Sequence, residues 1–295
     1  MSSKVKSRTA YQSLVTPVSR ARKLAIIGGG NMARSLIAGL LKDGWKSKQF
    51  RVADPNPAQR EMLAQHFGVA VFEHNTEAVM DAEGVLLAVK PQVLGQVLRE
   101  LAPVLLRNRP LLISIVAGVL VKDIQRSLGE PLPVVRVMPN TPAMVAAGAS
   151  GMYASPEVNA VQIDFAESLM RAVGLVVWVQ QESLMDAVTA LSGSGPAYVF
   201  LVMEAMEEAG VALGLERRTS RLLTLQTVFG AAKMALESEE TPATLRGHVT
   251  SPGGTTAAGV RELEQGLRDL FYSALDAAAD RAGVLAERYS AESET

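Results

Sequence analysis

Hydrophobic and polar residues alternate in two different ways along this chain, and the change falls near residue 180. Before it, short apolar runs of strand length alternate with amphipathic stretches of helical period. Repeated strand–helix units predict a parallel, doubly wound sheet that binds ligands at the carboxyl ends of its strands. We expect strands at 23–27, 50–53, 84–89, 111–116 and 133–138, and helices at 32–41, 59–67, 93–101 and 121–128.

After residue 180 the pattern is helical throughout, and Ala and Leu dominate it. The apolar positions of 196–213 and 222–235 spread too widely for one buried stripe, so these helices need partners on several sides. We therefore expect a Rossmann-type doubly wound parallel sheet over 23–180, followed by an all-α C-terminal dimerisation domain over 181–295. The expected helices of this second part are 184–191, 196–213, 217–236, 255–264 and 267–288.

Composition and charge narrow the function. A chain of 295 residues suits two domains, and a formal net charge of −1 provides no basic field for nucleic acid. No apolar run reaches the length of a membrane span. Cysteine is absent, and the three histidines show no metal-ligand spacing, so we expect no disulfide, thiol nucleophile or bound metal. These features predict a cytoplasmic protein with neither nucleic-acid nor membrane partners.

Residues 1–22 contain several basic residues, no acidic residue, and many Ser and Thr. That composition is compatible with an organelle transit peptide. The stretch 11–19 lacks a clear amphipathic helix, however, so we favour a disordered extension with no part in the chemistry.

A glycine-rich turn follows the first expected strand in the segment Ile-Ile-Gly-Gly-Gly-Asn-Met-Ala. Gly28, Gly30 and Ala33 match G-x-G-x-x-G/A between a strand and a helix. In this motif the first glycine makes the tight turn, and the second lets the backbone approach a pyrophosphate. The third position allows close packing of helix on strand. The next strand ends at Asp54, where a ribose-binding carboxylate belongs. The alternative is an ordinary glycine-rich turn without a ligand.

A second glycine turn, Ser-Pro-Gly-Gly-Thr-Thr, lies at residues 251–256 between two helical patterns. Pro252 fixes one φ angle, and Gly253 and Gly254 let the backbone turn sharply. Exposed N–H groups at a helix start bind anions, and a carboxylate fits as well as a phosphate. A plain helix N-cap would need only one Ser or Thr, so the sequence favours a ligand site here.

Five segments together resemble the pyrroline-5-carboxylate reductase family: IIGGGNMA from Ile26, AVKP from Ala88, MPNTP from Met138, SGSGPAY from Ser192 and TSPGGTT from Thr250. The match runs in order over about 23–287. SGSGPAY followed by SPGGTT is specific to the family, whereas the first turn is shared with many dehydrogenases. The resemblance implies reduction of 1-pyrroline-5-carboxylate to L-proline with NAD(P)H, the last step of proline biosynthesis. It also implies a homodimer of interlocked helical domains, often assembled into a decamer of five dimers.

The resemblance also suggests a substrate site. The N–H groups of Gly253, Gly254 and Thr255 would hold the substrate carboxylate, and the Thr256 hydroxyl would contact the ring nitrogen as the catalytic group. Glu182 matches a family position near bound substrate, and a solvated carboxylate before a helix is the equal alternative. Two further residues, Ser192 and Ser194, are expected to cap the helix that begins at Pro196.

For the cofactor, the resemblance assigns the pyrophosphate to the first turn, the nicotinamide side to the loop after the strand at 84–89, and the adenosine side to Asn75. Ala117 follows another strand at the same edge. Asp54 favours NADH, whereas Asn56, Arg60 and Arg34 could surround a 2′-phosphate; we expect NADPH, with NADH possible. The expected cofactor-binding residues are Gly28, Gly29, Gly30, Asn31, Met32, Asp54, Asn56, Asn75, Ala88, Val89, Lys90, Pro91 and Ala117.

Two other functions remain open from the sequence. A β-hydroxyacid dehydrogenase of similar build would need a catalytic lysine on a helix of the second domain, but the only lysine there, Lys233, lies beyond the SGSGPAY helix. A nucleotide-sensing module without enzymatic activity would need no second anion site. One local departure from the family is Arg246-Gly247-His248, where Lys-Asp commonly precedes the SPGG turn. The carboxylate lost by this change leaves the partner of one helix-end contact unassigned.

Overall fold

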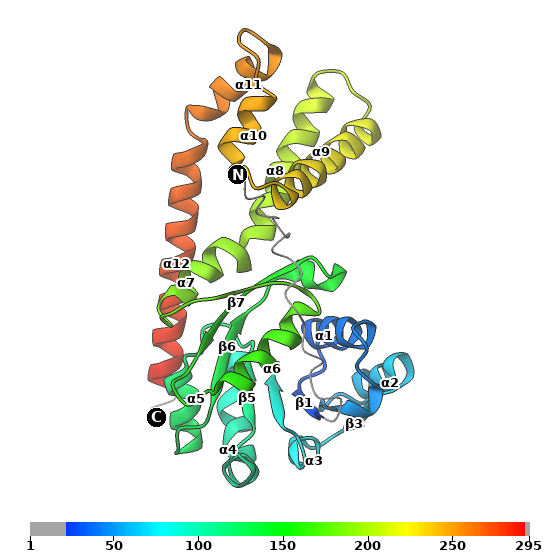
Figure 1. The fold of residues 1–295 in the computed structure, drawn as a ribbon, viewed down its shortest axis with the longest axis vertical. Helices are drawn as coiled ribbons and strands as arrows, with labels where there is room; N and C mark the ends of the chain where they lie inside the picture. Colours follow the sequence, from blue (N-terminus) through cyan, green and yellow to red (C-terminus); the bar gives the residue numbers. More distant parts are fainter. Residues whose placement is uncertain (1–21, 293–295) are drawn as a thin grey trace, which may run out of the picture. The chain divides into compact units, whose positions relative to one another are not determined.

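The computed structural model describes residues 22–292, and these fold as two compact units (Figure 1). Residues 22–185 and 284–292 form the first unit, and Asp186–Gly283 form the second. The basic N-terminal extension expected from the sequence lies outside the described residues, apart from Arg22.

The first unit contains an eight-stranded sheet in the order β3-β2-β1-β4-β5-β6-β7-β8. All neighbouring strands are parallel except β6 and β7. Because β2 and β4 lie on opposite sides of β1, the strand order reverses there, which is where doubly wound sheets bind their ligands. The strands are β1 (Leu24–Ile27), β2 (Phe50–Ala53), β3 (Ala70–Phe72), β4 (Gly84–Leu87), β5 (Leu111–Ser114), β6 (Val134–Met138), β7 (Gly148–Ala154) and β8 (Gly174–Trp178).

The central strands read as continuous apolar runs because both faces of the sheet are buried. Along β1, Leu24 and Ile26 contribute to the core under α1 and α6, whereas Ala25 and Ile27 face the core under α4 and α5. Helices thus cover both faces, as a doubly wound fold requires. The helices are α1 (Asn31–Lys42), α2 (Pro57–Phe67), α3 (Asn75–Val79), α4 (Pro91–Asn108), α5 (Val121–Leu128) and α6 (Ala160–Arg171), with short 3-10 turns η1 (Ser47–Gln49) and η2 (Thr141–Val145).

The five expected strands are all present, and three further strands were not predicted. β3 has only three residues, too few to show a period. β7 has the sequence GASGMYA, in which small residues hide the alternation. β8 is an edge strand whose Leu175 and Val177 are exposed, so it lacks the continuous burial that marks the central strands.

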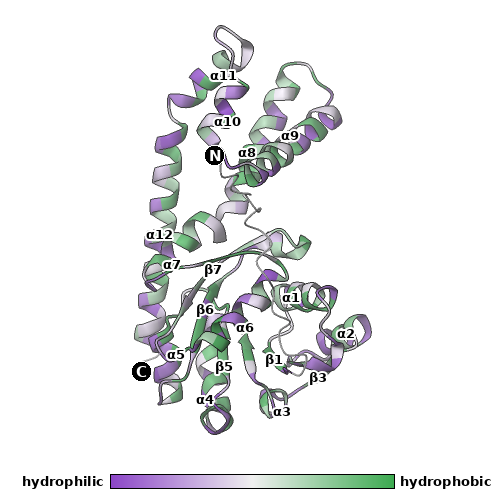
Figure 2. Cartoon of the chain, viewed as in Figure 1, coloured by the Kyte–Doolittle hydropathy of each residue, from purple (hydrophilic) through white to green (hydrophobic). Residues whose placement is uncertain are grey.

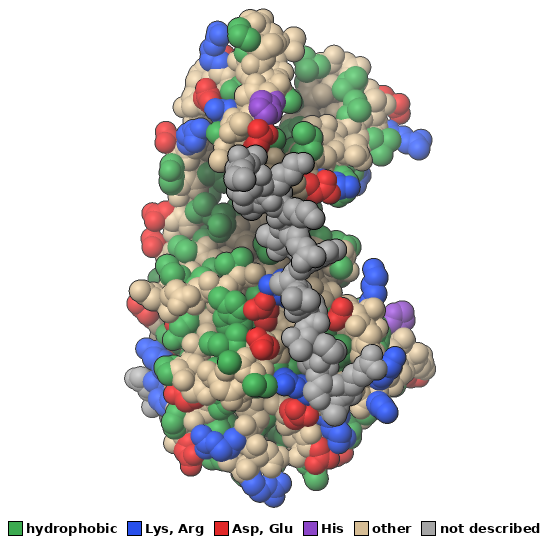
Figure 3. Space-filling model, viewed as in Figure 1, with side chains coloured by type: hydrophobic (Ala, Val, Ile, Leu, Met, Phe, Trp, Pro, Cys, Tyr) green, Lys and Arg blue, Asp and Glu red, His purple; other side chains and the backbone are tan. Residues whose placement is uncertain are grey.

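The second unit is entirely helical, and very little of it is buried. Within 186–283 the only buried residues are Ala190, Ser220, Thr224 and Ala282. Green apolar segments run along its helices in Figure 2, and hydrophobic side chains reach its surface in Figure 3. The helical elements, the first beginning in unit one, are α7 (Leu184–Val188), a π-helical turn η3 (Thr189–Gly193), α8 (Gly195–Ala212), α9 (Arg217–Glu237), α10 (Pro242–His248), α11 (Thr255–Glu264) and α12 (Leu267–Glu292).

The last turns of α12 belong to the first unit, although the sequence assigned 181–295 to one helical domain. The Ser290 hydroxyl donates to the fully buried Asp123 at 2.6 Å, and Arg126 donates to the Ser290 carbonyl at 3.0 Å. These hydrogen bonds fasten the chain's last helix to α5. These contacts join positions more than 160 residues apart, so no local sequence pattern predicts them.

The expected capping of α8 by serine is wrong. Ser194 occupies the N-cap position, but its side chain makes no cap hydrogen bond, and the Ser192 hydroxyl instead donates back to the Val188 carbonyl at 3.0 Å. The Ser194 N–H bonds to Thr189 O at 2.8 Å, five residues back. The helical path therefore continues from α7 through the π-helical turn into α8, leaving no separate helix start to cap. π-Helical turns of this kind are frequent at functional sites.

Candidate active site

The turn between β1 and α1 has the geometry that the glycine pattern predicts. Gly28 has φ 99°, and a Cβ there would lie 2.7 Å from the Ala88 carbonyl oxygen. Gly30 is the N-cap of α1, where no side chain caps the helix, and a Cβ there would meet nothing within 4 Å. Gly28 is therefore required by the fold, whereas Gly30 leaves open space in front of a helix start.

Gly29, the middle glycine of this turn, is hydrogen-bonded through both its N–H and its carbonyl group. Its N–H donates to the Asp54 carboxylate at 2.8 Å, and its carbonyl accepts from the Gln59 side chain. The first turn of α1 contains no acidic residue, so no side chain of the helix start itself repels an anion there. A dinucleotide pyrophosphate fits this arrangement, since backbone N–H groups and open space replace side chains at the contact.

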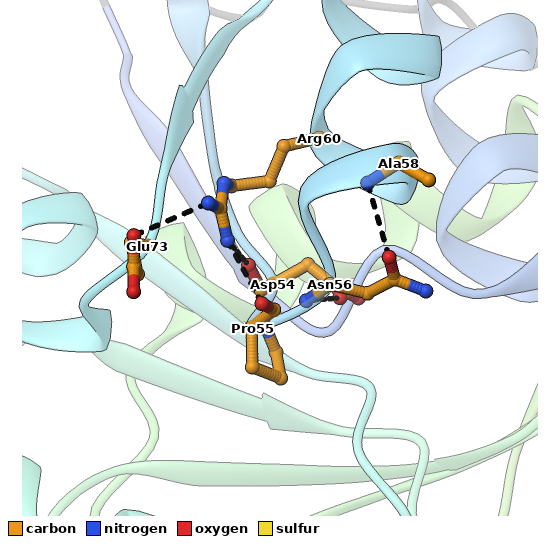
Figure 4. Close-up of polar contacts among 6 residues, drawn as sticks. All are labelled: Asp54, Pro55, Asn56, Ala58, Arg60 and Glu73. Carbon is orange, nitrogen blue, oxygen red and sulfur yellow. Dashed lines mark hydrogen bonds and ion pairs between the residues drawn. The ribbon is translucent and has the colours of Figure 1, made fainter.

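At the end of β2, the residues expected to face the adenosine ribose are engaged with each other (Figure 4). Asp54 also accepts from the Asn56 N–H at 2.9 Å, and Asn56 caps α2 by accepting from the Ala58 N–H at 3.0 Å. Arg60 donates to the carbonyls of Asp54 and Pro55, both at 2.9 Å. These contacts stiffen the β2–α2 turn, and they leave Arg60 less free than the sequence suggested.

The remaining cofactor candidates lie at the carboxyl ends of β4 and β5 and on α3. Lys90 is exposed at the N-cap of α4, and Pro91 begins that helix. The Ala88 N–H bonds to Ile27 O at 2.9 Å, which ties this loop to the β1 turn. Ala117 is exposed after β5. The Asn75 side chain donates to Glu100 at 3.1 Å, so its amide nitrogen already has a partner.

The second glycine turn also has the predicted backbone. Gly253 has φ 72°, and Gly254 is the N-cap of α11 without any side-chain cap. The Gly254 N–H is used within the turn, where it donates to Ser251 O at 3.0 Å. Among residues 22–292, the N–H groups of Thr255 and Thr256 have no partner. Of the three N–H groups that the sequence suggested, the one of Gly254 is therefore already used within the turn.

Before this turn, where the chain departs from the family pattern, Arg246 and His248 each contact a glutamate. Arg246 pairs with Glu264 of α11 at 2.8 Å, and His248 lies 3.5 Å from Glu240. The Arg246 carbonyl also accepts from the Thr250 hydroxyl at 2.6 Å. Arg246 therefore contacts Thr250, which precedes the glycines, and Glu264, at the end of α11.

Glu182 lies in the first unit, and its carboxylate is neither free nor fully solvated. One oxygen accepts from the Val121 N–H at 2.8 Å and from Arg136 at 3.1 Å. The Arg136 side chain is only 5% exposed, and Glu182 is the ion-pair partner found for it among the described residues. The carboxylate therefore holds the start of α5 and balances a buried cation.

Sequence reasoning missed Arg136, Asp123 and Gln59. Arg136 interrupts an otherwise apolar strand, and a charge in a buried strand needs a partner, so a signal for it existed. Asp123 and Gln59 have no such signal, because each lies on a helix among other polar residues, as an ordinary surface residue does. Within residues 22–292, no helix combines the length and apolarity needed to span a membrane.

Comparison with known proteins gives two family matches that follow the division of the chain. Residues 182–285 match the profile of pyrroline-5-carboxylate reductase dimerisation, and residues 23–118 match that of NADP oxidoreductase, coenzyme F420-dependent. A pyrroline-5-carboxylate reductase of Pseudomonas aeruginosa is 50% identical over 267 residues, covering 90% of this chain and 97% of that protein.

Two solved structures extend this similarity. A pyrroline-5-carboxylate reductase from Coxiella burnetii superposes with a TM-score of 0.87 at 45% identity, covering 90% of this chain and 98% of that one. The Plasmodium falciparum pyrroline carboxylate reductase, whose structure has NADP bound, superposes with a TM-score of 0.79 at 30% identity, covering 90% and 99%.

A doubly wound unit with a glycine turn of the dinucleotide-binding pattern, joined to a helical unit in which α11 starts without a side-chain cap, is the build of a two-domain nicotinamide-dependent oxidoreductase. Similarity over nine-tenths of the chain then gives the family. The chain belongs to the pyrroline-5-carboxylate reductase family. This confirms the resemblance drawn from the five motifs, and it decides against a β-hydroxyacid dehydrogenase or a sensing module.

Proposed function

We propose that the two glycine turns have separate binding roles in the reduction of a cyclic imine. The chain is an NAD(P)H-dependent oxidoreductase that reduces the C=N bond of 1-pyrroline-5-carboxylate to L-proline, the last step of proline biosynthesis. In this proposal the β1–α1 turn binds the dinucleotide and the start of α11 binds the substrate. The observation that carries the substrate half is the start of α11, where no side chain caps the first N–H groups.

The substrate carboxylate would bind where the helix begins. The N–H groups of Thr255 and Thr256 supply the donors, and the positive end of the helix dipole favours the anion. Gly253 gives the turn its left-handed φ. Gly254 contributes chiefly by lacking a Cβ, because its own N–H is used by Ser251.

Thr256 is the proposed catalytic residue. Its exposed hydroxyl would contact the ring nitrogen and help it stay protonated. A protonated imine is already strongly electrophilic, so orientation supplies most of the catalysis and no strong general base is required. Glu182 would then act on protein structure, through Arg136 and α5, since its carboxylate is committed to both.

The first unit would hold the cofactor by its pyrophosphate at Gly28–Met32, with Asp54 and Asn56 near the ribose and residues 88–91 and Ala117 toward the nicotinamide. When bound, the reduced nicotinamide supplies the hydride that adds to the C=N carbon. NADPH is the proposed cofactor, and NADH is a usable substitute. Asn75 would lie on the adenosine side, with its amide held by Glu100.

The active form in this proposal is a cytoplasmic homodimer, assembled further as five dimers. A helical unit with four buried residues among 98 lacks a core of its own, and a second copy would cover its exposed apolar side chains.

Steady-state turnover of pyrroline-5-carboxylate with NADPH and with NADH tests the proposal. We expect oxidation of either cofactor to depend on the imine and to yield proline. Cofactor binding without any imine-dependent oxidation would overturn it.

A further inference from the structure

The guanidinium of Arg60 lies at the end of β2, where Rossmann-type folds distinguish a ribose 2′-OH from a 2′-phosphate. Its Nη1 donates to the carbonyls of Asp54 and Pro55, and its Nη2 donates to Glu73 at 3.2 Å (Figure 4). An arginine has five N–H donors. Two therefore remain without a partner among residues 22–292, and the Nε–H is one of them.

The other charged groups near this turn differ from Arg60 in position or in charge. Arg34 lies on α1 rather than on the β2–α2 turn, and one of its N–H groups donates to the Asn31 side chain. The Asp54 carboxylate accepts two N–H groups and is itself negative. Arg60 is therefore the cation that is anchored to the β2–α2 turn itself, and Glu73 is the carboxylate paired with it.

Glu73 acts on the two cofactors differently. A 2′-phosphate carries nearly two negative charges at neutral pH, whereas a 2′-OH is neutral. The Glu73 carboxylate, 64% exposed, occupies one Arg60 donor and offsets its charge. It therefore weakens binding of the phosphate and leaves binding of the hydroxyl unchanged.

We propose that Glu73 is a specificity-determining residue. Its ion pair with Arg60 limits the preference for NADPH and keeps NADH usable. The inference rests on the proposed function. Glu73 is a positioning residue in this role, since it acts through Arg60 and touches no reacting atom.

The test is isothermal titration of 2′,5′-ADP and of 5′-AMP, in which only the former carries a 2′-phosphate. Glu73→Gln removes the charge but keeps an oxygen that Arg60 can bond, so the turn is retained. We expect the Kd of 2′,5′-ADP to fall about three- to tenfold and that of 5′-AMP to change less than about twofold. The kcat/KM ratio of NADPH to NADH should rise by a similar factor. High salt should reduce the gain.

Glu61→Gln is the matched control, because Glu61, on α2, is exposed like Glu73 but contacts Gln65 rather than Arg60. It should change neither Kd. In an Arg60→Gln background, Glu73→Gln should have no effect on the ratio.

Three results would overturn the inference: an unchanged Kd of 2′,5′-ADP in Glu73→Gln, an equal change for both nucleotides, or a full effect in the Arg60→Gln background. Failure of the proposed function is a separate outcome. It would show as wild-type protein that binds these nucleotides but does not turn over the imine.

Discussion

Thr256 is the second residue of α11, and its hydroxyl is the only side-chain group that the proposed reaction requires at the ring nitrogen. Thr256→Val keeps the shape of the side chain and removes one hydrogen bond to a charged group. Such a bond contributes about 1.5–3 kcal/mol, so kcat/KM for the imine should fall roughly ten- to a hundredfold. Steady-state kinetics at saturating cofactor measures it.

The neighbouring threonine provides the control for Thr256. Thr255 contributes its backbone N–H, which Thr255→Val retains, so this variant should stay within about threefold of the wild type. A Thr256→Val enzyme with wild-type kcat/KM would remove that hydroxyl from the mechanism.

At the scale of an element, the start of α11 depends on the absence of a side chain at Gly254. A Cβ there would lie 2.6 Å from the Ser251 hydroxyl and 3.2 Å from its carbonyl oxygen, so Gly254→Ala requires that hydroxyl to rotate away and the carbonyl to move by a few tenths of an ångström. Displaced donors should raise the substrate KM on the order of tenfold or more, with the NADPH Kd unchanged. Kinetics and nucleotide titration together measure this.

Gly259 offers a matched control within the same helix, because a Cβ there meets nothing within 4 Å. Gly259→Ala should leave KM unchanged and stabilise the helix by about 0.4–1 kcal/mol. If Gly254→Ala weakened substrate and nucleotide equally, the turn would be a general structural feature and the anion site would be misplaced.

The start of α5 provides a second prediction at this scale. Glu182→Gln removes the charge that balances the buried Arg136, so the free energy of unfolding should fall by about 1.5–3 kcal/mol. Because the carboxylate is committed within the first unit, the substrate KM should not change. Thermal or urea unfolding and kinetics test the two parts. A raised KM at unchanged stability would instead place Glu182 at the substrate.

At the scale of the whole molecule, exposed apolar side chains call for a second copy. Leu223 is 55% exposed on α9, in a unit that buries very little. Leu223→Glu should dissociate the dimer and abolish activity together. Sedimentation at assay concentration measures the assembly, and Lys48→Glu, an exposed change on η1, is the control that should leave both intact. A fully active monomer would refute the predicted dimer.

Much of the fold is visible in the sequence because the signals are local. Continuous apolar runs mark β1, β2, β4, β5 and β6, since both faces of those strands are buried. The prediction of a doubly wound sheet followed by helices is confirmed. The edge strand β8 was missed for the same reason, because its exposed residues give no burial pattern.

The sequence by itself determined the two glycine turns, the class of fold and the family. Gly28 and Gly253 adopt positive φ angles, which glycine tolerates because it has no Cβ. This is a property of the local backbone, so the sequence alone can indicate it. Only the tertiary structure decided which polar groups are free. Asp54 bonds Gly29, Arg60 bonds Glu73, Glu182 bonds Arg136, and Asp123 bonds Ser290. These pairs join segments 13 to 167 residues apart, and a side chain's partner at that distance depends on how strands and helices pack.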